Sequence, residues 1–172
     1  TLLFVWNTQA VAGDSDVVNC NRAWKIVVLG SSTAFGTGAT PRDSSWLNKF
    51  TAYVKRRNVQ HEIVNLAIPG FTTYQNLRPN GYTPPPGRPS PSSGFNITTA
   101  LNEDPDAIII NMPSNDAVAD YSLAEQQANF EATMVLCDLA NVPVWVTTSQ
   151  PRNNITPTQY QNLFDLRDWI NT

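Results

Sequence analysis

Three residues in this sequence have the chemistry that acyl transfer needs, and each follows a short apolar run. Ser32 stands in "VVLGSSTAFGTG", Gly70 in "NLAIPGFTT" and Asn115 in "NMPSNDA". A serine hydroxyl can attack an ester carbonyl, and a backbone N–H and a side-chain amide can stabilise the developing oxyanion. Singly, such residues are more often a helix cap, a turn glycine and an Asx-turn residue. The interpretation therefore depends on whether the fold brings all three together.

Four apolar runs predict the strands that would position these residues. They cover 25–30, 62–68, 106–112 and 142–148. Each is short, continuous and rich in β-branched residues, as is typical of parallel strands covered on both faces. In an open parallel sheet, ligands bind beyond the carboxyl ends of the strands, which share one rim. Ser32, Gly70 and Asn115 follow the first three strands, and Arg152, which we expect to be a rim or structural residue, follows the fourth.

Helical patterns separate the predicted strands. Apolar residues recur at helical spacing over 44–58. Ser122 and Glu125 form a capping box, and Thr156 before Pro157 marks another helix start. The alternation predicts an α/β fold: a three-layer α/β/α sandwich, flavodoxin-like, with a parallel central sheet and right-handed crossovers.

One segment, 77–94, interrupts this rhythm. Its sequence, "LRPNGYTPPPGRPSPSSG", is too dense in proline, glycine and serine for a regular element. It follows the second strand at the rim that carries Ser32, so we expect it to border the pocket. Because prolines limit its flexibility, it should form a preset wall rather than a mobile lid.

The three motifs together resemble the GDSL/SGNH serine hydrolases, an esterase and lipase family named for Ser, Gly, Asn and His in successive sequence blocks. The resemblance in order, spacing and strand context covers about residues 24–172. It implies that Ser32 is the nucleophile and an oxyanion N–H donor, that Gly70 is a second N–H donor, and that Asn115 donates from its side chain. It further implies ester hydrolysis through an acyl-enzyme, with no cofactor and no metal. Acetyl or other short acyl esters are the expected substrates; carbohydrate esters, lysophospholipids and thioesters are permitted.

The sequence departs from the family pattern at three points. The usual Gly-Asp-Ser is Gly30-Ser31-Ser32, and Pro113 replaces the usual glycine two residues before the asparagine. The third departure is the general base, which in the family is a histidine near the C-terminus, three residues after an aspartate. No such Asp-x-x-His segment is present, and the single histidine, His61, precedes the second strand. Since that strand spans roughly 20 Å, His61 should lie at the opposite edge and is not the base.

The missing base leads to an expectation about domain organisation. Residues 1–23 are expected to be an N-terminal arm or an extra strand, and 24–172 the hydrolase-like domain, C-terminally incomplete. A sheet edge or face should then lack cover and need a partner, either the missing C-terminal segment or a neighbouring domain. Without its base the protein's esterase activity should be impaired.

Two other functions compete with ester hydrolysis. One is a catalytically inactive domain of the same fold that binds carbohydrate or a partner, which the missing histidine favours. The other is nucleotide binding at the glycine-rich turn. A P-loop needs a lysine, which this turn lacks. A dinucleotide-binding fingerprint needs three glycines at set spacing, and Gly36 and Gly38 supply only two, too far after the strand. We therefore set nucleotide binding aside.

Composition narrows the class of protein. The 172 residues are 41% hydrophobic and 15% charged, with a net charge of −3, which gives no reason to expect nucleic acid or an anionic membrane surface. No apolar run approaches the ~20 residues of a membrane span. Cys20 and Cys137 lack metal-ligand spacing and should both lie at the amino-end edge, either as a disulfide or as free thiols. Ala10-Val11-Ala12 resembles a signal-peptidase site, although no initiator Met precedes it; the expected location is secreted or extracytoplasmic.

Overall fold

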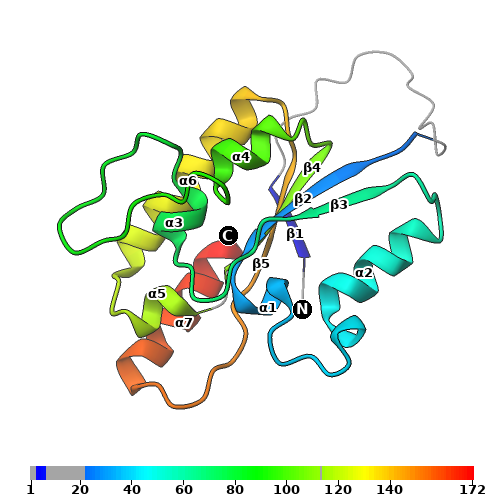
Figure 1. Cartoon of the computed structure of the whole chain (residues 1–172). Coiled ribbons are helices and arrows are strands. Elements are labelled where there is room, and N and C mark those ends of the chain that lie inside the picture. Colours follow the sequence, from blue (N-terminus) through cyan, green and yellow to red (C-terminus); the bar gives the residue numbers. More distant parts are fainter. Residues whose placement is uncertain (1–2, 7–21, 113) are drawn as a thin grey trace.

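The computed structural model describes residues 3–6, 22–112 and 114–172 and has an α/β architecture (Figure 1). The strands are β1 (Leu3–Trp6), β2 (Lys25–Gly30), β3 (Glu62–Asn65), β4 (Ala107–Asn111) and β5 (Val144–Thr147). The helices are α1 (Ser32–Phe35), α2 (Trp46–Lys55), α3 (Thr73–Leu77), α4 (Ile97–Asn102), α5 (Asn115–Val118), α6 (Leu123–Leu139) and α7 (Pro157–Ile170), with a 3-10 turn at Arg42–Ser44.

The strands form one sheet in the order β1-β5-β4-β2-β3. β2, β3, β4 and β5 are parallel, and their register places Gly30 opposite Asn111. This confirms the predicted parallel sheet and all four predicted strands: β2 has the predicted bounds, and β3, β4 and β5 are shorter than predicted. β1 pairs antiparallel with β5, Leu3 opposite Thr147. The edge of the sheet beside β5 is therefore occupied.

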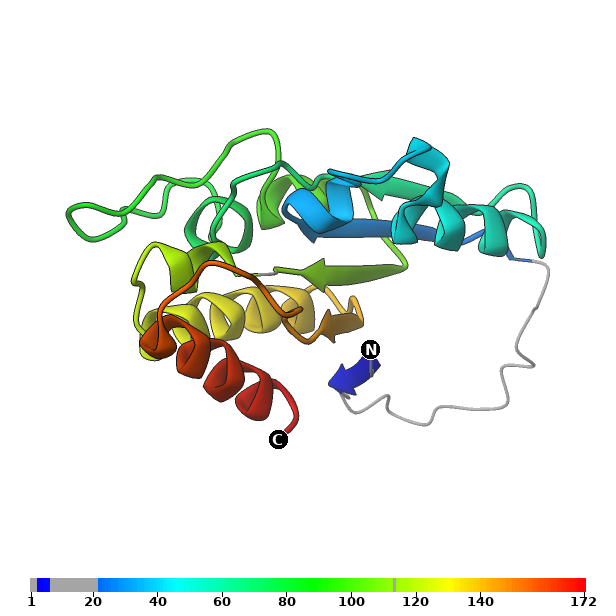
Figure 2. The same ribbon diagram turned by 90° about the horizontal axis from the view of Figure 1, so that it is seen from below.

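The two faces of the sheet carry separate hydrophobic clusters, because alternate residues of a strand point to opposite sides. On one face, Val27, Leu29 and Ile110 pack with residues of α3, α4, α6 and α7, among them Phe130 and Leu166. On the other face, the cluster includes the following residues of the strands, α1 and α2: Ile26, Val28, Ile109, Ala34 and Leu47. Figure 2 shows α6 and α7 on one side of the sheet and α2 on the other. The predicted three-layer arrangement is confirmed.

Local sequence signals explain where the longer helices begin. Ser122 and Glu125 form the predicted capping box at the start of α6. Thr156 caps α7, with Pro157 in its first turn. Ser45 accepts a hydrogen bond from the backbone N–H of Asn48 at the start of α2. Each cap satisfies N–H groups that a helix leaves without an internal partner.

Cys137 lies in the core near the end of α6 and has no disulfide partner among the described residues. Burial raises the pKa of this thiol to about 12, which makes it a poor nucleophile. Cys20, its candidate disulfide partner, lies outside the described residues, as does Pro113. The part of residues 1–23 that the structure describes consists of β1 and the two residues before Trp24.

Candidate active site

The turn after β2 holds Ser32 at the carboxyl end of the sheet. A Cβ added to Gly30 would lie 2.8 Å from both the backbone oxygen of Asn111 and the Cβ of Ala34. Only glycine therefore allows β2 to pass so close to β4 and α1. Ser32 is the first residue of α1 and is half-buried. The leading N–H groups of a helical turn have no partner within it, so the backbone N–H of Ser32 is available as a donor.

A tight turn after β3 presents the backbone of Gly70. The backbone N–H of Ile68 donates to the backbone oxygen of Gly30 (3.2 Å), which brings this turn beside the Ser32 segment. The turn is closed by a bond from the N–H of Phe71 to the oxygen of Ile68, also 3.2 Å. Pro69 and Gly70 hold the positions that these residues favour in a type II turn, and Gly70 has a φ of +85°. No described residue contacts a Cβ added at Gly70, so its backbone faces open space.

The side chain of Asn115 joins the two turns. Asn115 is the first residue of α5, and its Nδ2 donates to the Oγ of Ser31 (2.7 Å) and to the backbone oxygen of Phe71 (2.8 Å). Ser31 and Phe71 are the immediate neighbours of Ser32 and Gly70. The structure thus brings together the three segments that the sequence analysis selected, at the carboxyl ends of β2, β3 and β4.

Ser31 provides the acceptor at the position where the family motif has an aspartate. Its side chain is fully buried, whereas that of Ser32 is half-buried. Both hydrogens of the Asn115 amide are used in this arrangement, one on Ser31 and one on Phe71. Asn115 can therefore donate to a bound oxyanion only by sharing or giving up the bond to Ser31.

Arg152 is a site residue whose contact with Asn115 sequence reasoning did not foresee. Its Nη1 donates to the Oδ1 of Asn115 and to the Oγ of Ser114, both at 3.1 Å. From the same loop, Gln150 donates from Nε2 to the Oγ1 of Thr33. The sequence placed Arg152 after the fourth strand, at the same rim as Ser32. Nothing in the sequence identifies Ser114 and Asn115 as its hydrogen-bond partners.

Asp116 lies directly behind the site in a buried polar network. Its carboxylate accepts hydrogen bonds from the backbone N–H of Thr73 (3.1 Å) and from the Thr73 hydroxyl. The Thr73 hydroxyl accepts in turn from Asn129 (2.7 Å), and Asn129 accepts from Arg78. Burial raises the pKa of Asp116 to about 6, although the bonds from Thr73 act in the opposite direction. The network ties α5, which carries Asn115, to α3, which follows Gly70.

A cavity of about 540 Å³ opens beside the turn that carries Ser32 and Thr33. It is lined by Thr33, Trp46, Phe50, Ile109, Asn111 and residues 147–151. Three of its lining residues carry a buried polar atom without a hydrogen-bond partner: Trp46 Nε1, Asn111 Oδ1 and Ser149 Oγ. Each of these three atoms is covered from solvent and finds no partner among the described residues.

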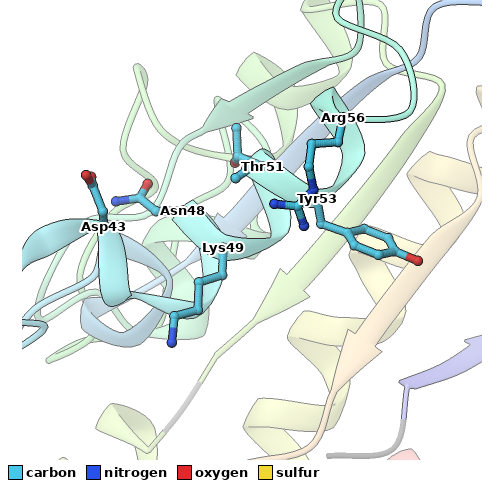
Figure 3. A pocket seen from close by; sticks show the side chains of 7 residues that line it. Asp43, Asn48, Lys49, Thr51, Tyr53 and Arg56 are labelled. Carbon is cyan, nitrogen blue, oxygen red and sulfur yellow. The ribbon is translucent and has the colours of Figure 1, made fainter.

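A second, more open cavity of about 690 Å³ lies along the outer side of α2. Its lining includes Asp43, Lys49, Tyr53 and Arg56. Figure 3 shows these side chains pointing in different directions along the helix rather than converging on one point. It offers no set of groups that could act together on a substrate.

Among the described residues, none places an imidazole beside Ser32. His61 lies at the amino end of the sheet, as expected, where its Nδ1 accepts from the backbone N–H of Trp24 (3.0 Å) just before β2. The described part of the chain also holds no group of three His, Cys, Asp or Glu residues able to bind a metal ion. It contains no helix that could cross a membrane.

The proline-rich segment packs on α3, α4 and α6 (Figure 1). Arg88 forms a two-point ion pair with Glu125 (2.6 and 3.1 Å) and lies over the ring of Tyr121. The backbone N–H of Asn80 donates to Thr98. The segment contributes no residue to the cavity beside Thr33. Its role as a wall of the substrate pocket stays a prediction.

Residues 28–172 match the GDSL-like lipase/acylhydrolase family. The chain belongs to this family. A search of curated proteins gives no match. Membership supports ester hydrolase activity, and the convergence of Ser32, Gly70 and Asn115 follows the block order of GDSL-like hydrolases.

Solved structures of GDSL-like hydrolases share the fold at low sequence identity. AlinE4, an SGNH-hydrolase family esterase, is 16% identical with a TM-score of 0.64, over 87% of this chain and 71% of its own. The esterase EstA from Pseudoalteromonas sp. is 16% identical with a TM-score of 0.63, over 85% and 70%. A putative lipolytic protein of the G-D-S-L family from Desulfitobacterium hafniense is 21% identical with a TM-score of 0.59, over 84% and 68%.

Proposed function

We propose that the protein hydrolyses carboxylic esters through an acyl-enzyme formed on Ser32. The observation that carries the proposal is the Asn115 side chain, which bonds the segments of Ser32 and Gly70 to each other. The Ser32 hydroxyl attacks the ester carbonyl. The oxyanion receives hydrogen bonds from the backbone N–H groups of Ser32 and Gly70 and from Asn115 Nδ2, once that amide releases Ser31. The tetrahedral intermediate collapses and expels the alcohol, which takes up the proton that left Ser32. Water then attacks the acyl-enzyme and releases the carboxylic acid and free Ser32.

The proposed reaction needs a general base that accepts the Ser32 proton. We propose that a histidine, oriented by an aspartate, enters the cavity beside Thr33 from outside the described residues. Two observations support this. The cavity adjoins the turn that carries Ser32, and no described residue places an imidazole there.

The proposed substrates are esters of acetyl or other short acyl groups, including those of carbohydrates. The support for these substrates is the family resemblance. The site residues bear on the type of reaction, and they do not distinguish one acyl group or alcohol from another. Hydrolysis rates for p-nitrophenyl acetate, butyrate and octanoate and for acetylated xylan would rank the acyl length and the alcohol. A rate that rises steadily toward octanoate would contradict the short-acyl assignment. The proposed location is extracytoplasmic.

A covalent label tests the nucleophile directly. A fluorophosphonate should modify the full-length gene product at one site, and peptide mass mapping should place the adduct on Ser32. Ser32→Ala should abolish labelling and ester hydrolysis. Ser31→Ala should still be labelled, although more slowly because Asn115 loses a buried acceptor. Ser44→Ala, at the exposed 3-10 turn, is the control. An adduct on Ser31 would overturn the assignment.

The second candidate function is a carbohydrate- or partner-binding domain of the same fold without catalysis. It is favoured by the lack of any base near Ser32 in the described part of the chain. Binding of acetylated xylan with no turnover by the full-length gene product, measured by calorimetry and product analysis, would support it.

A further inference from the structure

Arg152 directs its charge at the site rather than at a counter-ion. Its guanidinium donates to Asn115 Oδ1 and Ser114 Oγ, and no carboxylate of the described residues pairs with it. The side chain is exposed, so its charge is not needed to neutralise a buried group. Arg152 donates hydrogen bonds to an amide and a hydroxyl and not to a carboxylate of the described residues.

The contacts of Asn115 fix which way its amide points. Arginine has only donors, and a backbone carbonyl has only acceptors. The Asn115 oxygen must therefore face Arg152, and its nitrogen must face the backbone oxygen of Phe71. A flipped amide would set Nδ2 against the guanidinium and Oδ1 against the Phe71 carbonyl. Both contacts would then be repulsive.

The charge on Arg152 also changes the strength of the donor. A hydrogen bond from a guanidinium to an amide oxygen is charge-assisted and withdraws electron density from the amide. Hydrogen bonds in such a chain polarise one another, so the Nδ2 hydrogens become better donors. The strengthened hydrogens are those that face Ser31, next to the nucleophile.

We propose that Arg152 is a positioning residue that orients and polarises the Asn115 amide. Its effect on catalysis rests on the proposed function, whereas its effect on the amide does not. Gln150 belongs to the same loop and holds Thr33, next to Ser32. The loop after β5 thus contacts both the nucleophile turn and the oxyanion residue. A change in this loop would alter their relative position.

Kinetics of the full-length gene product on p-nitrophenyl acetate test the catalytic role. Arg152→Met should lower kcat about ten- to a hundredfold, the range expected for a charge-assisted bond, with little change in KM. Arg152→Lys should recover part of the loss. In an Asn115→Ala background, Arg152→Met should have no further effect, because Arg152 acts through Asn115. Arg56→Met, on the outer side of α2, is the control for removal of an exposed arginine.

The amide itself can be followed without any turnover. In the protein of residues 1–172, the side-chain ¹⁵N–¹H resonances of Asn115 are identified by their loss in Asn115→Ala. Arg152→Met should shift them and speed their exchange with water, while the thermal midpoint stays unchanged. Unchanged resonances and exchange would overturn the proposal, as would additive kinetic losses in the double variant. If the amide responds but no variant hydrolyses esters, the proposed function fails and the positioning role stands.

Discussion

At the scale of single residues, Asp116 is deeply buried, and no cation among the described residues contacts its carboxylate. Only 4% of the residue is exposed, and its carboxylate accepts hydrogen bonds from neutral groups of Thr73. Burial holds its pKa near 6, above the ordinary 3.8. Between these two pH values the folded protein binds more protons than the unfolded chain. The contribution of Asp116 to the free energy of unfolding therefore falls as pH rises from about 4 to 6.

We expect Asp116→Asn to remove this pH dependence. Denaturant unfolding at pH steps from 4 to 7 should show the wild-type free energy of unfolding falling through this window relative to the variant. Carbon NMR of the carboxyl should report a midpoint near 6. Asp120→Asn, at an exposed position after α5, is the matched control. Parallel curves for wild type and Asp116→Asn would show that the carboxyl is not perturbed.

At the scale of elements, the start of α6 anchors the proline-rich segment. Glu125 accepts two bonds from Arg88 and others from Ser122 and Tyr74. The bond from Arg88 is the main reason that the pKa of Glu125 lies at about 2, well below the ordinary 4.5. The folded state therefore gains stability from Glu125 above pH 4.5 and loses it as pH falls toward 2. One carboxylate serves both as helix cap and as loop anchor.

Removing this anchor should destabilise the loop more than the core. We expect Glu125→Gln to cost about 1.5–3 kcal/mol at pH 7, the range for hydrogen bonds to a charged group. The difference from wild type should shrink below pH 4. Hydrogen exchange should rise across 79–94, with little change in β2 and β4. Glu131→Gln, exposed on the same helix, should behave as wild type. Equal exchange in both variants would refute the anchoring role.

The elements that the sequence predicted are those with strong local signals. Continuous β-branched runs predicted β2 to β5, and side-chain caps predicted the starts of α6 and α7. The short helices α1 and α5 were not predicted, because four residues are too few for a periodic pattern.

In the site, too, the sequence predicted what local signals mark and missed what they do not. Ser32, Gly70 and Asn115 were selected because they follow strands. The contacts of Ser31 and Arg152 with Asn115 were not foreseen, because they join residues 84 and 37 positions apart that carry no shared motif.

At the scale of the whole molecule, one face of the sheet has a recess beside the turn that carries Ser32. In the described part of the chain, α1 and α2 supply the helices on that face, and the cavity beside Thr33 lies between α2 and the ends of β4 and β5. Ser32 has no imidazole beside it among the described residues. The base that we propose would therefore have room in this recess, next to Ser32.

This arrangement predicts that free imidazole can replace the base in the protein of residues 1–172. General base catalysis contributes about 10²–10⁴-fold, and soluble imidazole reaching Ser32 through the cavity should restore part of it. The gain in p-nitrophenyl acetate hydrolysis should saturate with imidazole and follow the fraction of its neutral form as pH rises. Ser32→Ala measures the background from imidazole alone. A gain equal to that background would place the base elsewhere. Full activity without imidazole would mean that Ser32 is activated by a group already within these residues.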